Sequence, residues 1–248
     1  MMEKFVDAGC RLGRPQIPNH QPWQTEKILE LMDRCRIEKA IVHHVVALEG
    51  PILEGNELTV QAAAACDRFI PQWCIMPNAF GEFMDVHTLH AALKENGVTT
   101  FRIAPLTYDH SMQPWAMGQY MDLAAACHIP VFLDYYQVSG DNLYTLCSTY
   151  PEVCFVITDT SYRLNRWLGP ILDCCRNLYV GTGNYVVHRG LKTFCERYGA
   201  ERLLFTSGLP TGSATAAVSL LCLSELSWEQ KEIIAYGNIE TMISEVRL

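Results

Sequence analysis

Two aspartates and two arginines stand where predicted strands end, and their side chains could carry acid–base chemistry and bind an anion. Asp134 closes one apolar stretch, and Asp159 follows the next one along the chain. Two carboxylates on neighbouring strands can act as acid and base when their surroundings separate their pKa values. Arg11 and Arg102 could each grip a carboxylate or phosphate through two parallel hydrogen bonds. The alternative is that the aspartates pair with these arginines and hold the site together without chemistry.

A histidine pair, His43-His44, stands near the end of another predicted strand. Successive strand residues face opposite sides, so at most one of the two points into the site. We favour His44 as a proton carrier or hydrogen-bond donor near neutral pH; the alternative is a strand histidine that only packs in the core. Further candidates for substrate binding, on nearby strand ends and loops, are Tyr162, Asn184 and Ser207.

A third carboxylate, that of Asp7, could join the same site. Together with Asp134 and Asp159 it could hold Mg²⁺ or Ca²⁺, because these hard cations prefer oxygen ligands. A nearby arginine would compete with such a cation for the same carboxylates. We therefore expect no cofactor and disfavour a divalent metal, and binding through these three residues is the open alternative.

The elements that must position these residues are strands and helices that alternate along the whole chain. Strands are expected at residues 5–9, 39–46, 69–76, 98–104, 130–134, 153–158, 178–181 and 202–206. Helices are expected at residues 25–35, 56–66, 83–95, 114–127, 141–149, 164–175, 187–198, 214–223, 228–235 and 239–246. Eight strands with intervening helices favour a (β/α)8 barrel, an α/β fold, over an open sheet. The carboxyl ends of the strands then meet at one end of the barrel, its mouth.

Local patterns refine this expectation. Period-two alternation places Asp7 and Gly9 of the first strand inside the barrel, together with Arg102 of the fourth. Pro170 should break the helix that contains it, because proline removes a backbone hydrogen bond. The proline-rich loop at residues 14–22 is long enough to hang over the mouth.

Composition narrows the class of protein. At 248 residues, the chain suits one barrel domain that spans residues 1–248. The net charge of −8 argues against a nucleic-acid partner. The sequence shows neither a leader peptide nor an apolar run of membrane length, so we expect a cytoplasmic protein without a membrane partner. Eleven cysteines without Cys-x-x-Cys spacing read as reduced core residues. The expected partner is a small-molecule substrate, with a homo-oligomer possible.

Four motifs lie at the expected junctions of strands and helices. They are Phe-Val-Asp-Ala-Gly-Cys-Arg-Leu-Gly at residues 5–13, Leu-Met-Asp-Arg-Cys-Arg-Ile-Glu-Lys-Ala-Ile-Val at residues 31–42, Asn56-Glu57 followed by Asp-Arg-Phe-Ile-Pro at residues 67–71, and Arg-Leu-Leu-Phe-Thr-Ser-Gly-Leu-Pro at residues 202–210 with Gly237-Asn238. These motifs resemble the amidohydrolase-related superfamily of (β/α)8 barrels. Their order and spacing cover nearly the whole chain. The resemblance implies the barrel fold and hydrolase or lyase chemistry at its mouth.

The chain departs from this family at the metal site. The family's metal enzymes usually carry histidines at two positions of the first strand and at the ends of strands five and six, with an aspartate ending strand eight. Those positions here hold Gly9, Arg11, Asp134, Asp159 and Gly208. Glycine supplies no ligand and a guanidinium repels a cation, so the usual zinc mechanism is disfavoured.

Three functions remain open from the sequence. The first is a metal-independent hydrolase or lyase for a small anionic or polyhydroxylated substrate, such as a lactone or a carboxylate. In it Arg11 and Arg102 orient the negative group, and Asp134 and Asp159 exchange protons with help from His44. The second is a barrel that has lost catalysis and serves as a ligand-binding or regulatory protein. The third is a metal-dependent hydrolase with a carboxylate site.

Overall fold

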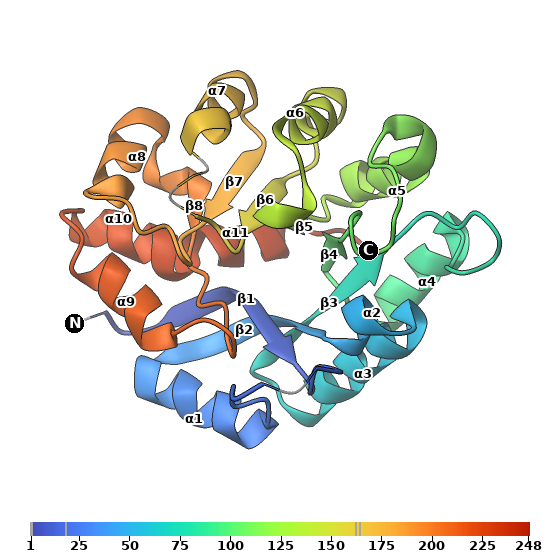
Figure 1. Ribbon diagram of the computed structural model, residues 1–248, viewed down its shortest axis with the longest axis horizontal. Coiled ribbons are helices and arrows are strands. Elements are labelled where there is room, and N and C mark those ends of the chain that lie inside the picture. The colour runs from blue at the N-terminus through green and yellow to red at the C-terminus, as the bar shows by residue number, and fades with distance from the viewer. Residues whose placement is uncertain (1, 18, 162, 164) are drawn as a thin grey trace.

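The computed structural model of the protein describes residues 2–17, 19–161, 163 and 165–248. Its centre is one sheet of parallel strands in the order β1-β2-β3-β4-β5-β6-β7-β8, ringed by helices (Figure 1). The strands are β1 (Phe5–Leu12), β2 (Ile37–His44), β3 (Phe69–Ile75), β4 (Thr100–Ile103), β5 (Val131–Asp134), β6 (Phe155–Thr158), β7 (Leu178–Gly181) and β8 (Leu203–Leu204). The expected (β/α)8 barrel is confirmed.

Backbone hydrogen bonds join the last strand to the first and so close the barrel. The amide of Ala8 donates to the carbonyl of Phe205 at 2.9 Å, and the amide of Arg11 donates to the carbonyl of Leu209 at 2.8 Å. These bonds continue beyond the short β8 along residues 205–209. They hold residues 8–11 beside residues 205–209.

The helices follow the strands in the alternating order that the sequence predicts. They are α1 (Thr25–Cys35), α2 (Val46–Glu49), α3 (Ile52–Ala65), α4 (Val86–Asn96), α5 (Pro114–Cys127), α6 (Gly140–Thr149), α7 (Asn165–Cys174), α8 (Gly190–Tyr198), α9 (Ala214–Cys222), α10 (Trp228–Glu232) and α11 (Asn238–Ser244). Short 3-10 turns lie at Tyr135–Gln137 and Ala200–Arg202, and a π-helical turn at Ile233–Gly237 joins α10 to α11. No helix among the described residues is long and apolar enough to cross a membrane.

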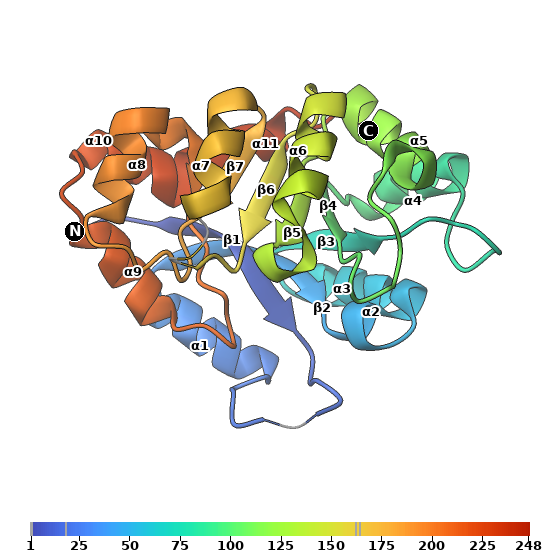
Figure 2. The same cartoon turned by 45° about the horizontal axis from the view of Figure 1, so that its top comes forward.

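Two local expectations differ from the structure. α7 runs through Pro170 without the expected break. Its buried face, formed by Leu168, Ile171 and Leu172, packs against the barrel, and this packing compensates for the hydrogen bond that proline removes. The described residues of the loop at 14–22 extend away from the body of the barrel (Figure 2), and none of them lines the cavities that Asp159 borders; Arg14 instead lines another pocket, beside Gly13 and His44.

The inside of the barrel changes from apolar to polar toward the mouth. Its lower part is a buried cluster that includes Ile41, Phe132, Val156 and Leu204, against which Ile239 and Met242 of α11 pack. Two residues further along the same strands stand His43, Asp134, Thr158 and Thr206, which line a cavity at the mouth. Strand alternation therefore carries polar side chains to the same end from several strands.

The register of β1 is irregular between Asp7 and Cys10, and this changes which of its side chains face the interior. Val6 and Ala8 belong to the lower apolar cluster, whereas Gly9 and Arg11 line the cavity at the mouth. Asp7 is buried but does not line that cavity. The simple alternation expected for this strand is therefore correct for Gly9 and wrong for Asp7.

Candidate active site

Three cavities adjoin at the carboxyl ends of the strands. We call the deepest one the inner cavity; its volume is about 10 Å³, and it is lined by Gly9, Arg11, His43, Arg102, Asp134, Thr158, Asp159, Thr206 and Gly208. The outer pocket, of about 380 Å³, is lined by Tyr135, Tyr136, Asp159, Thr160, Ser161, Asn184, Thr211 and Gly212. The side pocket, of about 570 Å³, lies between α8 and α9. Asp159 borders the first two cavities, and Asn184 borders the last two.

A network of two arginines and two aspartates closes the floor of the mouth. The Arg11 guanidinium stands between Asp159, with Nη2 and Oδ2 separated by 2.5 Å, and Asp134, with Nη2 and Oδ2 separated by 3.2 Å. The Arg102 Nη1 lies 2.8 Å from Asp134 Oδ1, and its Nε donates to Gln72 Oε1 at 2.7 Å. Two positive and two negative charges balance in this network. The aspartates thus pair with both arginines, which is the arrangement expected from the sequence as the alternative to acid–base chemistry.

Asp134 is the fixed member of the network. Its side chain is only 5% exposed, and Thr158 Oγ1 donates to its Oδ1 at 2.7 Å while the Tyr136 hydroxyl donates to its Oδ2 at 3.2 Å. Burial raises the pKa of Asp134, but Arg102 and Arg11 outweigh burial and hold that pKa well below its usual range. Asp134 therefore stays ionised near neutral pH, which argues against the proton exchange expected of it.

Asp159 is the member of the network that meets the open pocket. Its side chain is 22% exposed, and it forms an ion pair with Arg11. The residue follows β6 with a φ of 50°, a left-handed conformation that aspartate tolerates better than most residues. This backbone turn places one carboxylate between the inner cavity and the outer pocket. Asp159 is therefore the carboxylate that a ligand in the outer pocket would meet.

The two neighbouring histidines face opposite ways, as their position on one strand requires. His43 lines the inner cavity and is opposite Arg11 in the pairing of β1 with β2. His44 lies on the outer face, where its Nδ1 accepts a hydrogen bond from the amide of Val46 and its ring packs against Gly13. The structure thus separates His44 from Asp134 and Asp159, and the histidine that reaches them is His43.

Ser207 is engaged by a different aspartate. Its amide donates to Asp7 Oδ1 at 2.8 Å, and its hydroxyl donates to Asp7 Oδ2. The amide of Gly9 also donates to Asp7 Oδ1, at 3.0 Å. Burial raises the pKa of Asp7, and the three hydrogen bonds oppose that effect. Asp7 therefore ties β1 to the chain after β8 and stands apart from the arginine network.

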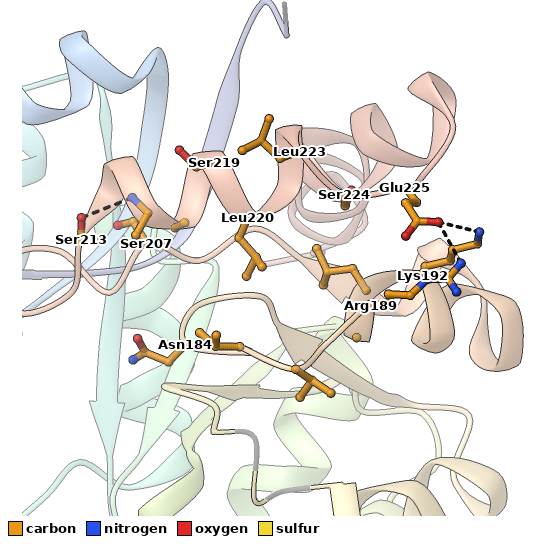
Figure 3. A pocket seen from close by; sticks show the side chains of 16 residues that line it. Asn184, Arg189, Lys192, Ser207, Ser213, Ser219, Leu220, Leu223, Ser224 and Glu225 are labelled. Carbon is orange, nitrogen blue, oxygen red and sulfur yellow. Dashed lines mark hydrogen bonds and ion pairs between the residues drawn. The ribbon is translucent and has the colours of Figure 1, made fainter.

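The side pocket extends the site sideways (Figure 3). Asn184 and Ser207 lie at its inner end, and Leu220 lines its middle. Arg189 and Lys192 at the other end both contact Glu225 Oε2, at 2.8 Å and 3.0 Å. Two of the expected substrate-binding residues thus border this pocket, whereas Tyr162 lies outside the described residues.

Comparison with known proteins gives a match at the level of fold. No family model matches the chain, and no curated protein matches it. Among solved structures, 2,6-dihydroxybenzoate decarboxylase from Rhizobium is 12% identical, with 98% of this chain and 99% of that chain covered and a TM-score of 0.78. A putative amidohydrolase from Staphylococcus aureus is 12% identical over 97% of this chain and 99% of that chain, with a TM-score of 0.75. The expected resemblance to amidohydrolase-related barrels is confirmed for the fold.

A third solved structure corrects the cofactor expectation. A dihydroxybenzoic acid decarboxylase from Polaromonas sp. JS666, 13% identical over 100% of this chain and 98% of that chain with a TM-score of 0.75, was crystallised with bound manganese. Our expectation of no cofactor, with a divalent metal disfavoured, is contradicted by this finding. That expectation rests on the missing histidines and on the arginines that compete for the carboxylates, whereas a protein with this fold binds manganese.

The residues at this mouth nevertheless do not fit manganese in the arrangement described. Manganese favours several carboxylate or water oxygens around one ion. Here the oxygens of Asp134 accept hydrogen bonds from Arg11, Arg102, Thr158 and Tyr136, and Asp159 contacts Arg11. The described part of the chain holds no group of three or more His, Cys, Asp or Glu side chains that could bind a metal ion. A guanidinium therefore supplies the positive charge between these carboxylates.

Proposed function

We propose that this chain is a hydrolase or lyase of the amidohydrolase-related kind that acts on a small carboxylate or lactone. The observation that carries the proposal is the position of the Arg11 guanidinium between a fixed carboxylate, Asp134, and a carboxylate that meets the outer pocket, Asp159. The decarboxylase and amidohydrolase names of proteins with the same fold support the reaction class.

Asp159 acts as the proton acceptor in this proposal. A carboxylate at the edge of the pocket can take a proton from a water molecule that attacks a lactone, or from a carbon next to a carbonyl group. When Asp159 takes the proton, its negative charge disappears and one positive charge in the network loses its partner. The oxyanion that forms on the substrate in the same step replaces that partner. Proton uptake and anion stabilisation are thus coupled through Arg11.

Asp134 and Arg102 position Arg11 for this task. Arg102 is almost fully buried and shares Asp134 with Arg11, so the carboxylate is held from two sides. A preorganised cation can stabilise developing charge without reorganising during the reaction. Because the pKa of Asp134 is held well below its usual range, this residue keeps its charge throughout and gives Arg11 one constant partner.

The outer pocket sets the size and character of the substrate. Its volume of about 380 Å³ lies within the range of small-molecule sites, which is roughly 300–1,000 Å³. Tyr135 and Tyr136 form one wall, which suits a flat or ring-shaped substrate, and Asn184 supplies an amide at the opening toward the side pocket. Burial raises the pKa of Tyr136 to about 12, so its hydroxyl keeps its proton near neutral pH.

Turnover measurements on Asp159→Asn test the proposal. Wild-type protein is assayed with hydroxybenzoates and sugar lactones, each with and without added manganese. For any substrate that is turned over, Asp159→Asn should lower kcat by roughly 10²- to 10⁴-fold, the usual contribution of a general base. Asp173→Asn is the matched control, because Asp173 also pairs with an arginine at 2.5 Å but on the surface, between α7 and α8. Wild-type turnover by Asp159→Asn would refute the role of Asp159.

A binding protein without catalysis is the second candidate, and one observation favours it. Both carboxylates at the floor of the mouth already have guanidinium partners, as they would in a barrel that had lost its reaction and kept its charges paired. In that case a small carboxylate should raise the melting temperature of the wild-type protein without being converted. Arg11→Met should then abolish the temperature shift.

A further inference from the structure

The side chain of His43 has an unusual environment. It is 1% exposed, it lines the inner cavity, and neither of its ring nitrogens has a hydrogen-bond partner among the described residues. Arg11 is its partner in the pairing of β1 with β2. Polar atoms this deeply buried are nearly always hydrogen-bonded, so the His43 ring indicates a partner in the inner cavity for one of its nitrogens.

The charges around His43 fix its protonation. Burial lowers the pKa of His43 well below its usual value, and Arg102 and Arg11 lower it further. Asp134, which faces the ring from β5, opposes this effect, and His44 on the same strand adds slightly to it. The ring is therefore neutral near pH 7, with one nitrogen that donates a hydrogen bond and one that accepts.

The size of the inner cavity limits what can bind there. About 10 Å³ is close to the space that one water molecule needs. The guanidinium groups of Arg11 and Arg102 and the hydroxyls of Thr158 and Thr206 also line this cavity. An oxygen atom fits such a wall, because it can accept hydrogen bonds from the guanidinium groups and from the neutral imidazole.

We propose that His43, Arg11 and Arg102 form a subsite for a single oxygen atom at the floor of the mouth. In the free protein the oxygen is that of a water molecule. With a carboxylate ligand in place, it is one carboxylate oxygen that reaches inward past Asp159; this second part rests on the proposed function. His43 is then a substrate-contacting residue, which selects ligands by the oxygen that they place between the two guanidinium groups.

Nitrogen NMR of ¹⁵N-histidine-labelled wild-type protein tests the subsite directly. We expect His43 to be neutral at pH 6 and to show a cross-peak between its ring and a bound water proton. Acetate, the simplest carboxylate probe, should shift both ring nitrogens of His43 and leave those of His44 unchanged. If acetate leaves His43 unshifted and no water contacts the ring, the subsite does not exist.

Two variants on the same strand complete the test. His43→Phe keeps an aromatic ring at this position and removes both nitrogens, so acetate affinity should fall roughly three- to tenfold, as expected for one lost hydrogen bond. His44→Phe, whose side chain points to the outer face, should bind acetate like the wild type. Unchanged affinity in His43→Phe would overturn the proposal. Bound water at His43 in a protein without any turnover would refute the proposed function and leave the subsite standing.

Discussion

Replacing Asp134 by asparagine should destabilise the barrel strongly, because this one carboxylate is the partner of two arginines. Asparagine keeps the shape of the side chain and removes its charge. Arg102, almost completely buried, then loses its ion pair with Asp134, and Arg11 keeps its ion pair with Asp159. Breaking a buried pair by removing one partner typically costs about 3–5 kcal/mol, since the other charge stays buried without compensation. We expect a loss in that range for Asp134→Asn.

The matched comparison is Asp159→Asn. Asp159 is more exposed than Asp134, and its loss leaves Arg11 paired with Asp134. The loss of stability should therefore be clearly smaller, roughly 1 kcal/mol or less, as for pairs nearer to solvent. Urea denaturation at pH 7, followed by circular dichroism and tryptophan fluorescence, gives both free energies of unfolding.

A double-mutant cycle makes the reasoning refutable. Arg102→Met removes the buried cation and keeps much of its length, so the double variant Arg102→Met, Asp134→Asn no longer contains an unpaired Arg102. Its loss of stability should be smaller than the sum of the two single losses, by roughly 1–3 kcal/mol. Additive losses, or a loss below about 1 kcal/mol for Asp134→Asn alone, would show that the network does not hold the mouth together.

Two further predictions concern pH and the backbone. The pKa of His43 is lowered in the folded state, so below pH 6.5 the unfolded chain binds a proton that the folded chain excludes, and stability falls as pH falls. Between pH 6.5 and 5, the free energy of unfolding of His43→Phe should therefore fall less steeply than that of the wild type, with a slope difference that approaches about 1.4 kcal/mol per pH unit near pH 5; equal slopes would contradict the lowered pKa. Gly13→Ala should lower the free energy of unfolding, measured by urea denaturation, more than Gly97→Ala does. Both glycines have a positive φ, but only at Gly13 would the added Cβ meet a side chain, because it would lie 2.0 Å from His44 Nε2. Equal losses would mean that the ring of His44 moves aside freely.

The fold could be predicted because its signals are local and repeat along the chain. The bounds expected for α5 and β7 agree with the structure, at Pro114–Cys127 and Leu178–Gly181. Pro114 begins α5 because its fixed φ suits a first helical position, and Gly181 ends β7 before a turn. α2 was not expected, because a four-residue helix has too few positions to show a period and Val45 gives no side-chain cap.

The site was only partly predictable, because it depends on which alternate residues of each strand face the barrel interior. Arg11, Arg102, Asp134 and Asp159 come together as expected. His43 could not be told from its neighbour because β2 is buried on both faces from Ala40 to His43, and such a run does not reveal which residues point inward. Counting by twos from Ile41, an interior residue, leads to His43, but only the structure identifies Ile41 as interior. The irregular register of β1 likewise has no counterpart in the sequence pattern.

The charge balance of the mouth makes both candidate functions, enzyme and binding protein, depend on Asp159. Two arginines and two aspartates already cancel, so a further anion can enter only if one negative charge leaves Arg11 or is neutralised. Asp134 cannot do this near neutral pH, because two guanidinium groups hold its pKa low. Asp159 can, either by taking a proton in the reaction or by giving up its place to a ligand carboxylate. The first route makes the barrel a catalyst and the second a receptor, and both depend on the single contact between Asp159 and Arg11.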